Sequence, residues 1–163
     1  MIGCMPAPGK FGKLWIDAQE WLLGRMVGLS ARMRRGPAMA PHLVTGLDGE
    51  LAAYFQMKRL GYRVVARRWT NPRMRGDVDL IGWDGGCLCF VEVKTRSERD
   101  STPAESAVDE DKREMVRGLA RAYLRALHET ERATVQVRFD VVSVYSIQGI
   151  TEFEVFHGAF GWQ

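Results

Sequence analysis

Two apolar segments joined by a glycine turn constrain the fold of this chain more than any other feature. Residues 77–83 and 87–94 are rich in apolar residues, and the tetrapeptide Trp83-Asp84-Gly85-Gly86 between them is typical of a tight β-hairpin. The second segment is apolar enough to be a central strand that is covered on both sides. Charged side chains at the end of such a strand are costly to bury unless they are paired or bind a cation, so they are candidates for chemistry.

Side chains alternate along a strand, which assigns these charged residues to faces. Asp77 and Asp79 share one face of the first strand, and Glu92 and Lys94 share one face of the second. The opposite face of the second strand is expected to be core and carries Cys89, Val91 and Val93.

The length of the turn decides whether Asp79 and Glu92 face the same way. A two-residue loop at Asp84-Gly85 or at Gly85-Gly86 puts both on one face. A three-residue loop puts them on opposite faces unless a bulge restores the register. The sequence leaves these alternatives open.

If Asp79 and Glu92 converge, they form an oxygen-rich site together with the backbone carbonyl of Val93. Mg²⁺ commonly binds through one or two carboxylates, water and a phosphate, and Mn²⁺ is the other candidate. Such a metal polarises a phosphodiester and activates water. Lys94 would lie beside that water, where it can orient it or stabilise developing charge. The pattern thus predicts Asp79, Glu92 and Lys94 as catalytic residues.

The remaining pattern predicts an α/β fold in two parts. Residues 1–45 form an N-terminal extension with one helix and a proline-containing linker over 36–45, and residues 46–163 form the compact domain. Apolar periodicity and turn residues predict the order α-β-β-β-α-β-β in that domain. The expected elements are helices over 14–35, 47–60 and 109–128, and strands over 62–69, 77–83, 87–94, 134–145 and 150–156.

Composition narrows the class of protein. Residues 1–75 hold 13 Lys and Arg against 4 Asp and Glu, whereas residues 76–163 hold 10 against 16. A basic part beside an acidic part suits a protein that attracts a polyanion and holds a cation, although such asymmetry also serves solubility. Three cysteines without a C-x-x-C pair argue against a disulfide scaffold or zinc site, and no segment is predicted to span a membrane. We therefore expect a cytoplasmic protein.

The pattern Asp79…Glu92-Val93-Lys94 resembles the PD-(D/E)XK nuclease superfamily. More narrowly, the chain resembles the YraN-type family of small bacterial proteins, which are related to archaeal Holliday-junction resolvases. The resemblance covers roughly residues 47–160. It rests on Gly49-Glu50, Ala53, Leu60-Gly61-Tyr62, Arg67, Gly76-Asp77-Val78-Asp79-Leu80-Ile81, Phe90-Val91-Glu92-Val93-Lys94-Thr95-Arg96 and Arg138-Phe139-Asp140-Val141-Val142.

The resemblance implies a restriction-endonuclease-like αβββαβ core, with a mixed central sheet flanked by helices. It also implies that Glu50, Asp79 and Glu92 match metal-ligand positions and that Lys94 matches the catalytic lysine. Without the resemblance, Glu50 would be interpreted as an ordinary acid in the first turn of a helix. Two departures stand out: Val78 replaces the proline of the superfamily, and Asp77 replaces the usual glutamate of the family.

Basic residues near this hairpin are candidates for contacts with nucleic acid. Arginines before the acidic strand surround Trp69, and a second set recurs every four residues on the long helix. The alternative is that they are solvated charges with partners on the same helix, and this is favoured for Arg121 and Arg125. Asp140 is expected to be a structural hydrogen-bond acceptor. The predicted nucleic-acid contacts are Arg67, Arg68, Arg75, Arg96, Lys112, Arg113 and Arg117.

The sequence therefore favours a Mg²⁺- or Mn²⁺-dependent endonuclease that hydrolyses phosphodiester bonds of DNA, with branched or damaged DNA as a candidate substrate. A nucleic-acid-binding accessory protein that keeps the nuclease fold without turnover is the alternative. A homodimer is compatible with either.

Overall fold

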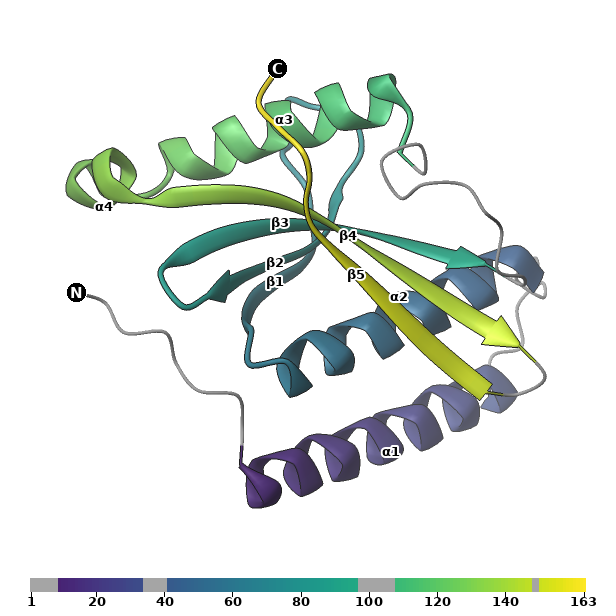
Figure 1. Ribbon diagram of the computed structural model, residues 1–163. Coiled ribbons are helices and arrows are strands. Elements are labelled where there is room, and N and C mark those ends of the chain that lie inside the picture. The colour runs from purple at the N-terminus through teal and green to yellow at the C-terminus, as the bar shows by residue number, and fades with distance from the viewer. Residues whose placement is uncertain (1–8, 34–40, 97–107, 148–149) are drawn as a thin grey trace.

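A five-stranded mixed sheet forms the centre of the molecule (Figure 1). The computed structural model describes residues 9–33, 41–96, 108–147 and 150–163. Strands follow the order β1-β2-β3-β4-β5, and β3 and β4 are parallel whereas the other neighbours are antiparallel. The strands are β1 (Arg63–Trp69), β2 (Val78–Asp84), β3 (Cys87–Arg96), β4 (Gln136–Ile147) and β5 (Ile150–Phe160).

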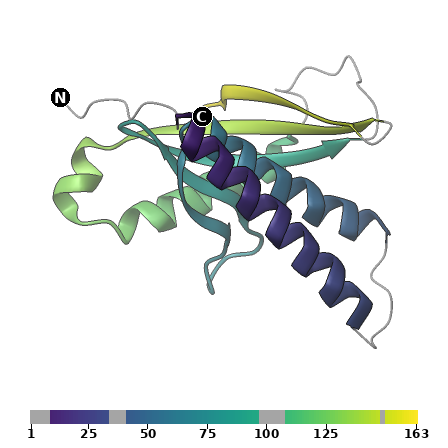
Figure 2. The ribbon, with the colours of Figure 1, turned by 90° about the horizontal axis from the view of Figure 1, so that it is seen from below.

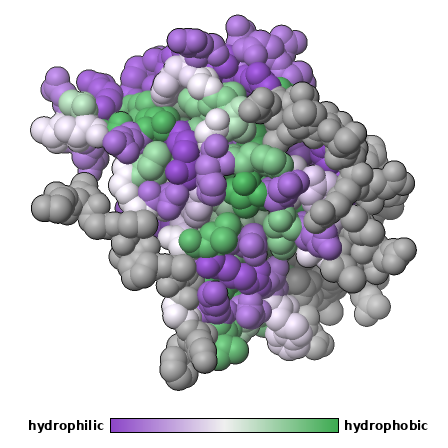
Figure 3. Space-filling view, in the orientation of Figure 1, coloured by the Kyte–Doolittle hydropathy of each residue, from purple (hydrophilic) through white to green (hydrophobic). Residues whose placement is uncertain are grey.

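Helices cover both faces of this sheet. α3 (Glu110–Arg125) lies on one face and α2 (Pro41–Arg59) on the other, with α1 (Lys10–Met33) alongside α2 (Figures 1 and 2). A short helix, α4 (Glu129–Thr134), lies between α3 and β4. Hydrophilic residues crowd the rim of the molecule along α3 (Figure 3). The predicted fold class, an α/β protein with a mixed sheet between helices and an additional N-terminal helix, is confirmed.

Strand β3 contributes to two separate hydrophobic cores. Leu88 and Phe90 pack under α3 with residues of β4 and β5, whereas Cys89 and Val91 pack under α2. This alternation is what a strand covered on both faces requires. It confirms that Cys89 and Val91 face a core, and it places Glu92 on the side of α3.

The N-terminal helices differ in their bounds from the predicted ones. α2 begins at Pro41 and not at residue 47, so it starts inside the expected linker over 36–45 and crosses the expected boundary at residue 45. Proline is compatible with this position because the first turn of a helix has no partner for its backbone N–H groups. Residues 36–40 of that linker, with residues 34–35 of the expected first helix, lie outside the described residues.

Helix α1 is attached to α2 by polar contacts. Arg59 of α2 donates to Asp17 at 2.6 Å and also pairs with Glu20, and Lys58 donates to Gln19 at 3.0 Å. Helix α1 also exposes large apolar side chains. These are Leu14, Trp15, Trp21 and Leu22, whereas Ile16 is buried.

The last strands also shift relative to the prediction. The expected strand from residue 134 begins at Gln136, because residues 129–134 form α4, and the final strand extends from the expected end at residue 156 to Phe160. None of the helices in the described ranges combines the length and the apolar composition needed to cross a membrane.

Candidate metal and nuclease site

The β2–β3 hairpin puts its two acidic strand positions on the same face. Asp84 pairs with Cys87, which leaves a two-residue turn of glycines, and Gly85 there adopts a φ of 58°. Continuing this register along the strands sets Asp79 opposite Glu92. Of the turns that the sequence allowed, the structure therefore has the two-residue loop at Gly85-Gly86.

Two ammonium groups contact the buried carboxylate of Glu92. Its side chain is only 4% exposed, and Oε1 lies 3.1 Å from Nζ of Lys94 on the same strand. Its other oxygen, Oε2, lies 3.0 Å from Nζ of Lys112 in the first turn of α3. Lys112 also approaches the backbone carbonyl of Asp77 at 3.4 Å. The site therefore contains both basic residues that the sequence placed near it.

The Asp79 carboxyl group is buried beside Glu92 and is hard to ionise. Burial and, next in size, the negative charge of Glu92 raise its pKa from 3.8 to about 7. The backbone N–H of Val93 opposes this effect by donating to Oδ2 at 2.7 Å, and so does the charge of Lys112. At neutral pH the protonated and the ionised form of the Asp79 side chain are therefore both populated.

Lys112 experiences the opposite balance. Burial lowers the pKa of its ammonium group, but the charge and hydrogen bond of Glu92, with the charges of Asp79 and Asp77, outweigh burial and raise it. Lys112 is therefore held as a cation in the site. This is the expected behaviour of a buried charge with an opposite charge in contact.

Glu50 of α2 comes near the same strand ends from the other helix layer. Burial raises the pKa of its carboxyl group, as do the charges of Asp77 and Glu92, whereas Arg68 and Arg67 lower it. Its Oε2 is buried and accepts no hydrogen bond from the residues that the structure describes. The nearest cation to that oxygen is Nε of Arg68, at 3.7 Å.

Arg68 has a role that the sequence did not indicate. Its guanidinium Nε lies 3.3 Å from Oδ2 of Asp77 and 3.7 Å from Oε2 of Glu50. One arginine therefore forms ion pairs with two carboxylates from different parts of the chain. Its backbone φ is 47°, in the left-handed region that non-glycine residues rarely adopt. No sequence pattern marks an arginine with this backbone. Strain of this kind often accompanies functional positions.

Two glycines allow the helices to approach the site. A Cβ on Gly49 would lie 1.9 Å from Oγ1 of Thr95, so only glycine lets the start of the Glu50 helix turn rest against the end of β3. Gly76 has a φ of 80° and faces Met115 of α3 equally closely. Both belong to the segments on which the family resemblance rests.

The donor chemistry fits a hard divalent cation at Asp79 and Glu92. Two adjacent buried carboxylates favour an added cation, since the charge of Glu92 raises the pKa of Asp79, and Val93 lies between Glu92 and Lys94 in the sequence. Within the described ranges, however, no group of three or more His, Cys, Asp or Glu is arranged to hold a metal. Convergence of Glu50 with the other two is therefore not seen, and its ligand role stays a prediction.

The predicted nucleic-acid contacts separate into accessible and internal residues. Arg67 and Arg75 are exposed, and the guanidinium of Arg67 lies 5.1 Å from the ring centroid of Tyr54. Arg96 is half-buried at the end of β3. These three side chains are at least partly exposed to solvent, so their contact with a phosphate stays a prediction.

The position of Arg117 corrects the prediction that this residue, one of the arginines that recur every four residues on α3, contacts nucleic acid. Its side chain is buried, donating from Nε to the carbonyl of Gly161 at 2.8 Å and from Nη1 to Glu110 at 2.5 Å. Helical spacing placed Arg117 opposite the apolar stripe, but the segment after β5 covers it. Arg117 therefore fastens this segment to α3, and we no longer expect it to contact a phosphate.

Asp140 lies in a second polar cluster under the sheet and is structural, as predicted. It is fully buried and accepts from Nε of Arg138 at 2.8 Å, from the Tyr62 hydroxyl at 3.2 Å and from the N–H of Gly158 at 2.9 Å. His157, to which the sequence assigned no role, lies 3.0 Å from the Tyr62 hydroxyl. Asp140 thus links β4 to β5 and to the residue that precedes β1, so this cluster stabilises the sheet.

Comparison with known proteins finds relatives that carry one family name. The chain is 44% identical over 124 residues to a UPF0102 protein of Koribacter versatilis, which covers 76% of this chain and 84% of the relative. It is 41% identical over 139 residues to a UPF0102 protein of Solibacter usitatus, covering 85% and 100%. A UPF0102 protein of Symbiobacterium thermophilum is 45% identical over 101 residues, covering 61% and 80%. The profile of the uncharacterised protein family UPF0102 matches residues 49–144, a range that includes every residue of the candidate site. The chain therefore belongs to the UPF0102 family.

Proposed function

We propose that this protein is a metal-dependent endonuclease that hydrolyses phosphodiester bonds of DNA. One observation carries the proposal: Asp79 and Glu92 lie opposite each other on one face of the hairpin, with Lys94 3.1 Å from Glu92. Buried carboxylates beside a lysine at a strand end are costly for a merely structural role. They suit a site that receives a cation and a phosphate.

Each residue has a separate task in the proposed reaction. Asp79 and Glu92 would hold a Mg²⁺ ion, and that ion, when bound, would polarise the phosphodiester and activate water. Lys94 is close enough to orient the attacking water or to stabilise charge on the phosphate. Lys112 holds the Glu92 carboxylate in place from α3. Exposed Arg67 and Arg75 would add attraction for the DNA backbone.

A second candidate function has its own observation in favour. Lys94 and Lys112 together neutralise the Glu92 carboxylate, and the described part of the chain shows no three-residue metal group. A protein in this state could bind DNA through its basic residues without cleaving it. The alternative is thus an accessory protein with the nuclease fold and no turnover.

Cleavage assays separate these two functions. The protein would be incubated with duplex, single-stranded and four-way-junction DNA in Mg²⁺, in Mn²⁺ and in EDTA. Glu92→Gln and Lys94→Ala test the site, and Glu114→Ala on the exposed side of α3 is the matched control. Metal-dependent cleavage that both site variants lose and the control keeps supports the enzyme. Binding without cleavage of any substrate overturns it and supports the accessory protein.

A further inference from the structure

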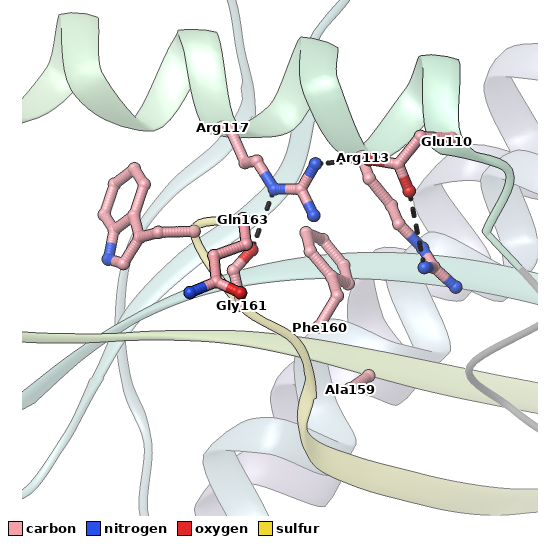
Figure 4. A pocket seen from close by; sticks show the side chains of 8 residues that line it. Glu110, Arg113, Arg117, Ala159, Phe160, Gly161 and Gln163 are labelled. Carbon is pink, nitrogen blue, oxygen red and sulfur yellow. Dashed lines mark hydrogen bonds and ion pairs between the residues drawn. The ribbon is translucent and has the colours of Figure 1, made fainter.

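A pocket of about 600 Å³ lies between α3 and the segment that follows β5. Its size is in the range of sites for small molecules. Figure 4 shows Arg113 and Arg117 extending from α3 on either side of Phe160, with Glu110 beside them and Gln163 near Arg117. The segment after residue 144 lies beyond the range matched by the family profile, so the pocket is not implied by membership of the family.

One of the two pocket arginines still has an open donor. Arg117 is occupied by Gly161 and Glu110, as described above. Arg113 has only a long contact of 3.5 Å between Nη1 and Glu110, and its Nε is buried without a hydrogen-bond partner among the described residues. A buried guanidinium donor without an acceptor is unfavourable, and an oxyanion would satisfy it.

Aromatic rings form the other part of the pocket. Phe160 lies beneath both guanidinium groups, with its centroid 5.8 Å from Arg113 and 5.7 Å from Arg117. Trp162 remains 38% exposed. Its ring is braced edge-on against Phe139 at 4.8 Å. A rigid aromatic surface beside a guanidinium is the combination with which proteins bind the bases of single-stranded nucleic acids.

We propose that this pocket binds a nucleotide, with its phosphate on Arg113 and its base against Trp162. The Arg121 guanidinium lies 5.4 Å from the centroid of the Trp162 ring, and the rest of this partly exposed ring can receive a base, which a bare anion does not supply. An apolar ligand would leave the Arg113 Nε without an acceptor. A nucleotide satisfies both groups. The amide of Gln163, which also lines the pocket, can donate to and accept from the edge of a base.

The source of the nucleotide is an unpaired stretch of a DNA strand, an assignment that rests on the proposed nuclease function. Lys112 contacts Glu92, and the next residue, Arg113, lines the pocket, so the two sites lie on adjacent sides of α3, about 100° apart around the helix. A helix is about 10 Å wide, roughly three nucleotides of strand at 3.4 Å per nucleotide. One strand can therefore occupy both sites.

Binding in EDTA tests the pocket without requiring cleavage. A fluorescein-labelled ten-nucleotide oligo(dT) strand would be titrated with the full chain by fluorescence anisotropy. Arg113→Gln and Trp162→Ala are each expected to weaken binding about tenfold, the usual size of one stacking or charge-assisted contact. Arg125→Gln removes one charge from an exposed position of α3 and is the control, with less than threefold loss expected. Trp162→Phe keeps the aromatic surface and should bind within threefold of the wild type.

Competing ligands identify the source of the nucleotide. Displacement of the strand by dTMP supports the pocket with a free nucleotide as its ligand, whereas binding that dTMP does not displace supports a strand. An equal loss in Arg113→Gln and Arg125→Gln overturns the pocket, and so does an equal loss for a blunt duplex. If these binding losses appear while no DNA is ever cleaved, the nuclease proposal fails and the pocket stands.

Discussion

Replacing Asp79 by Asn should make the protein more stable at neutral pH and remove much of its pH dependence. The asparagine carbonyl can still accept the hydrogen bond from Val93 N, which is 2.7 Å from Asp79 Oδ2, so the exchange removes charge with little change of shape. What it abolishes is the cost of ionising a carboxyl group that is 8% exposed and faces Glu92.

The size of the effect follows from the raised pKa of Asp79. The folded value of about 7 exceeds the ordinary value of 3.8 by about 3 units, which corresponds to roughly 4 kcal/mol. A carboxyl group with a raised pKa contributes fully to stability below pH 3.8, and the contribution is lost as pH rises through the folded pKa. Wild type should therefore lose up to about 4 kcal/mol relative to Asp79→Asn between pH 4 and pH 8, mostly below pH 7.

Urea unfolding from pH 4 to pH 8.5, in EDTA, measures this difference directly. Titrations shared by both proteins cancel in the comparison. Repeating the series in Mg²⁺ adds a second test, because a cation held by Asp79 and Glu92 stabilises the ionised site by about 2.7 kcal/mol at a hundred times its Kd. That gain should appear in wild type and be largely absent in Asp79→Asn. Parallel curves of unfolding free energy against pH for the two proteins would refute the reasoning.

Three further perturbations test other parts of the structure. Gly49→Ala places a methyl group 1.9 Å from Thr95 Oγ1 and should cost about 1–3 kcal/mol by overpacking in thermal unfolding, whereas an unchanged Tm would contradict the close approach. Asp140→Ala leaves Arg138 without its buried partner and should cost about 3–5 kcal/mol in urea unfolding, with a loss below 1 kcal/mol counting against a structural role. Lys112→Met removes a competing cation from Glu92 and should tighten Mg²⁺ binding on the order of tenfold by calorimetry, and weaker binding would show that Lys112 assists the metal.

The hairpin was the part of the molecule that local sequence rules could predict. Alternation along the strands assigned Glu92 and Lys94 to one face, and the glycine pair limited the turn to a few geometries. Lys112 was predicted as a nucleic-acid contact near the hairpin, and its position one helical turn before the buried Val116 agrees with its inward direction. In each case the residues compared lie in one hairpin or one helix, and the regular geometry of that element determines which side chains share a face.

The features that escaped prediction depend on distant segments. Arg117 is buried because a segment 44 residues away folds over α3, and helical periodicity carries no information about that. Arg68 bridges two carboxylates through an unusual φ that follows the register shift in β1. The participation of His157 in the Asp140 cluster likewise depends on the pairing of β4 with β5.

The parallel pairing of β3 with β4 has a consequence for how this protein folds. The β2–β3 hairpin is local and can form within about 1–10 μs, whereas the β3–β4 pairing must first close the long connection that contains α3. Asp79 and Glu92 thus come together before Lys112 arrives to offset their charges. We expect the late folding barrier to rise with pH, as the nascent hairpin comes to hold two anions with only Lys94 to offset them, and to fall when Mg²⁺ supplies further positive charge early.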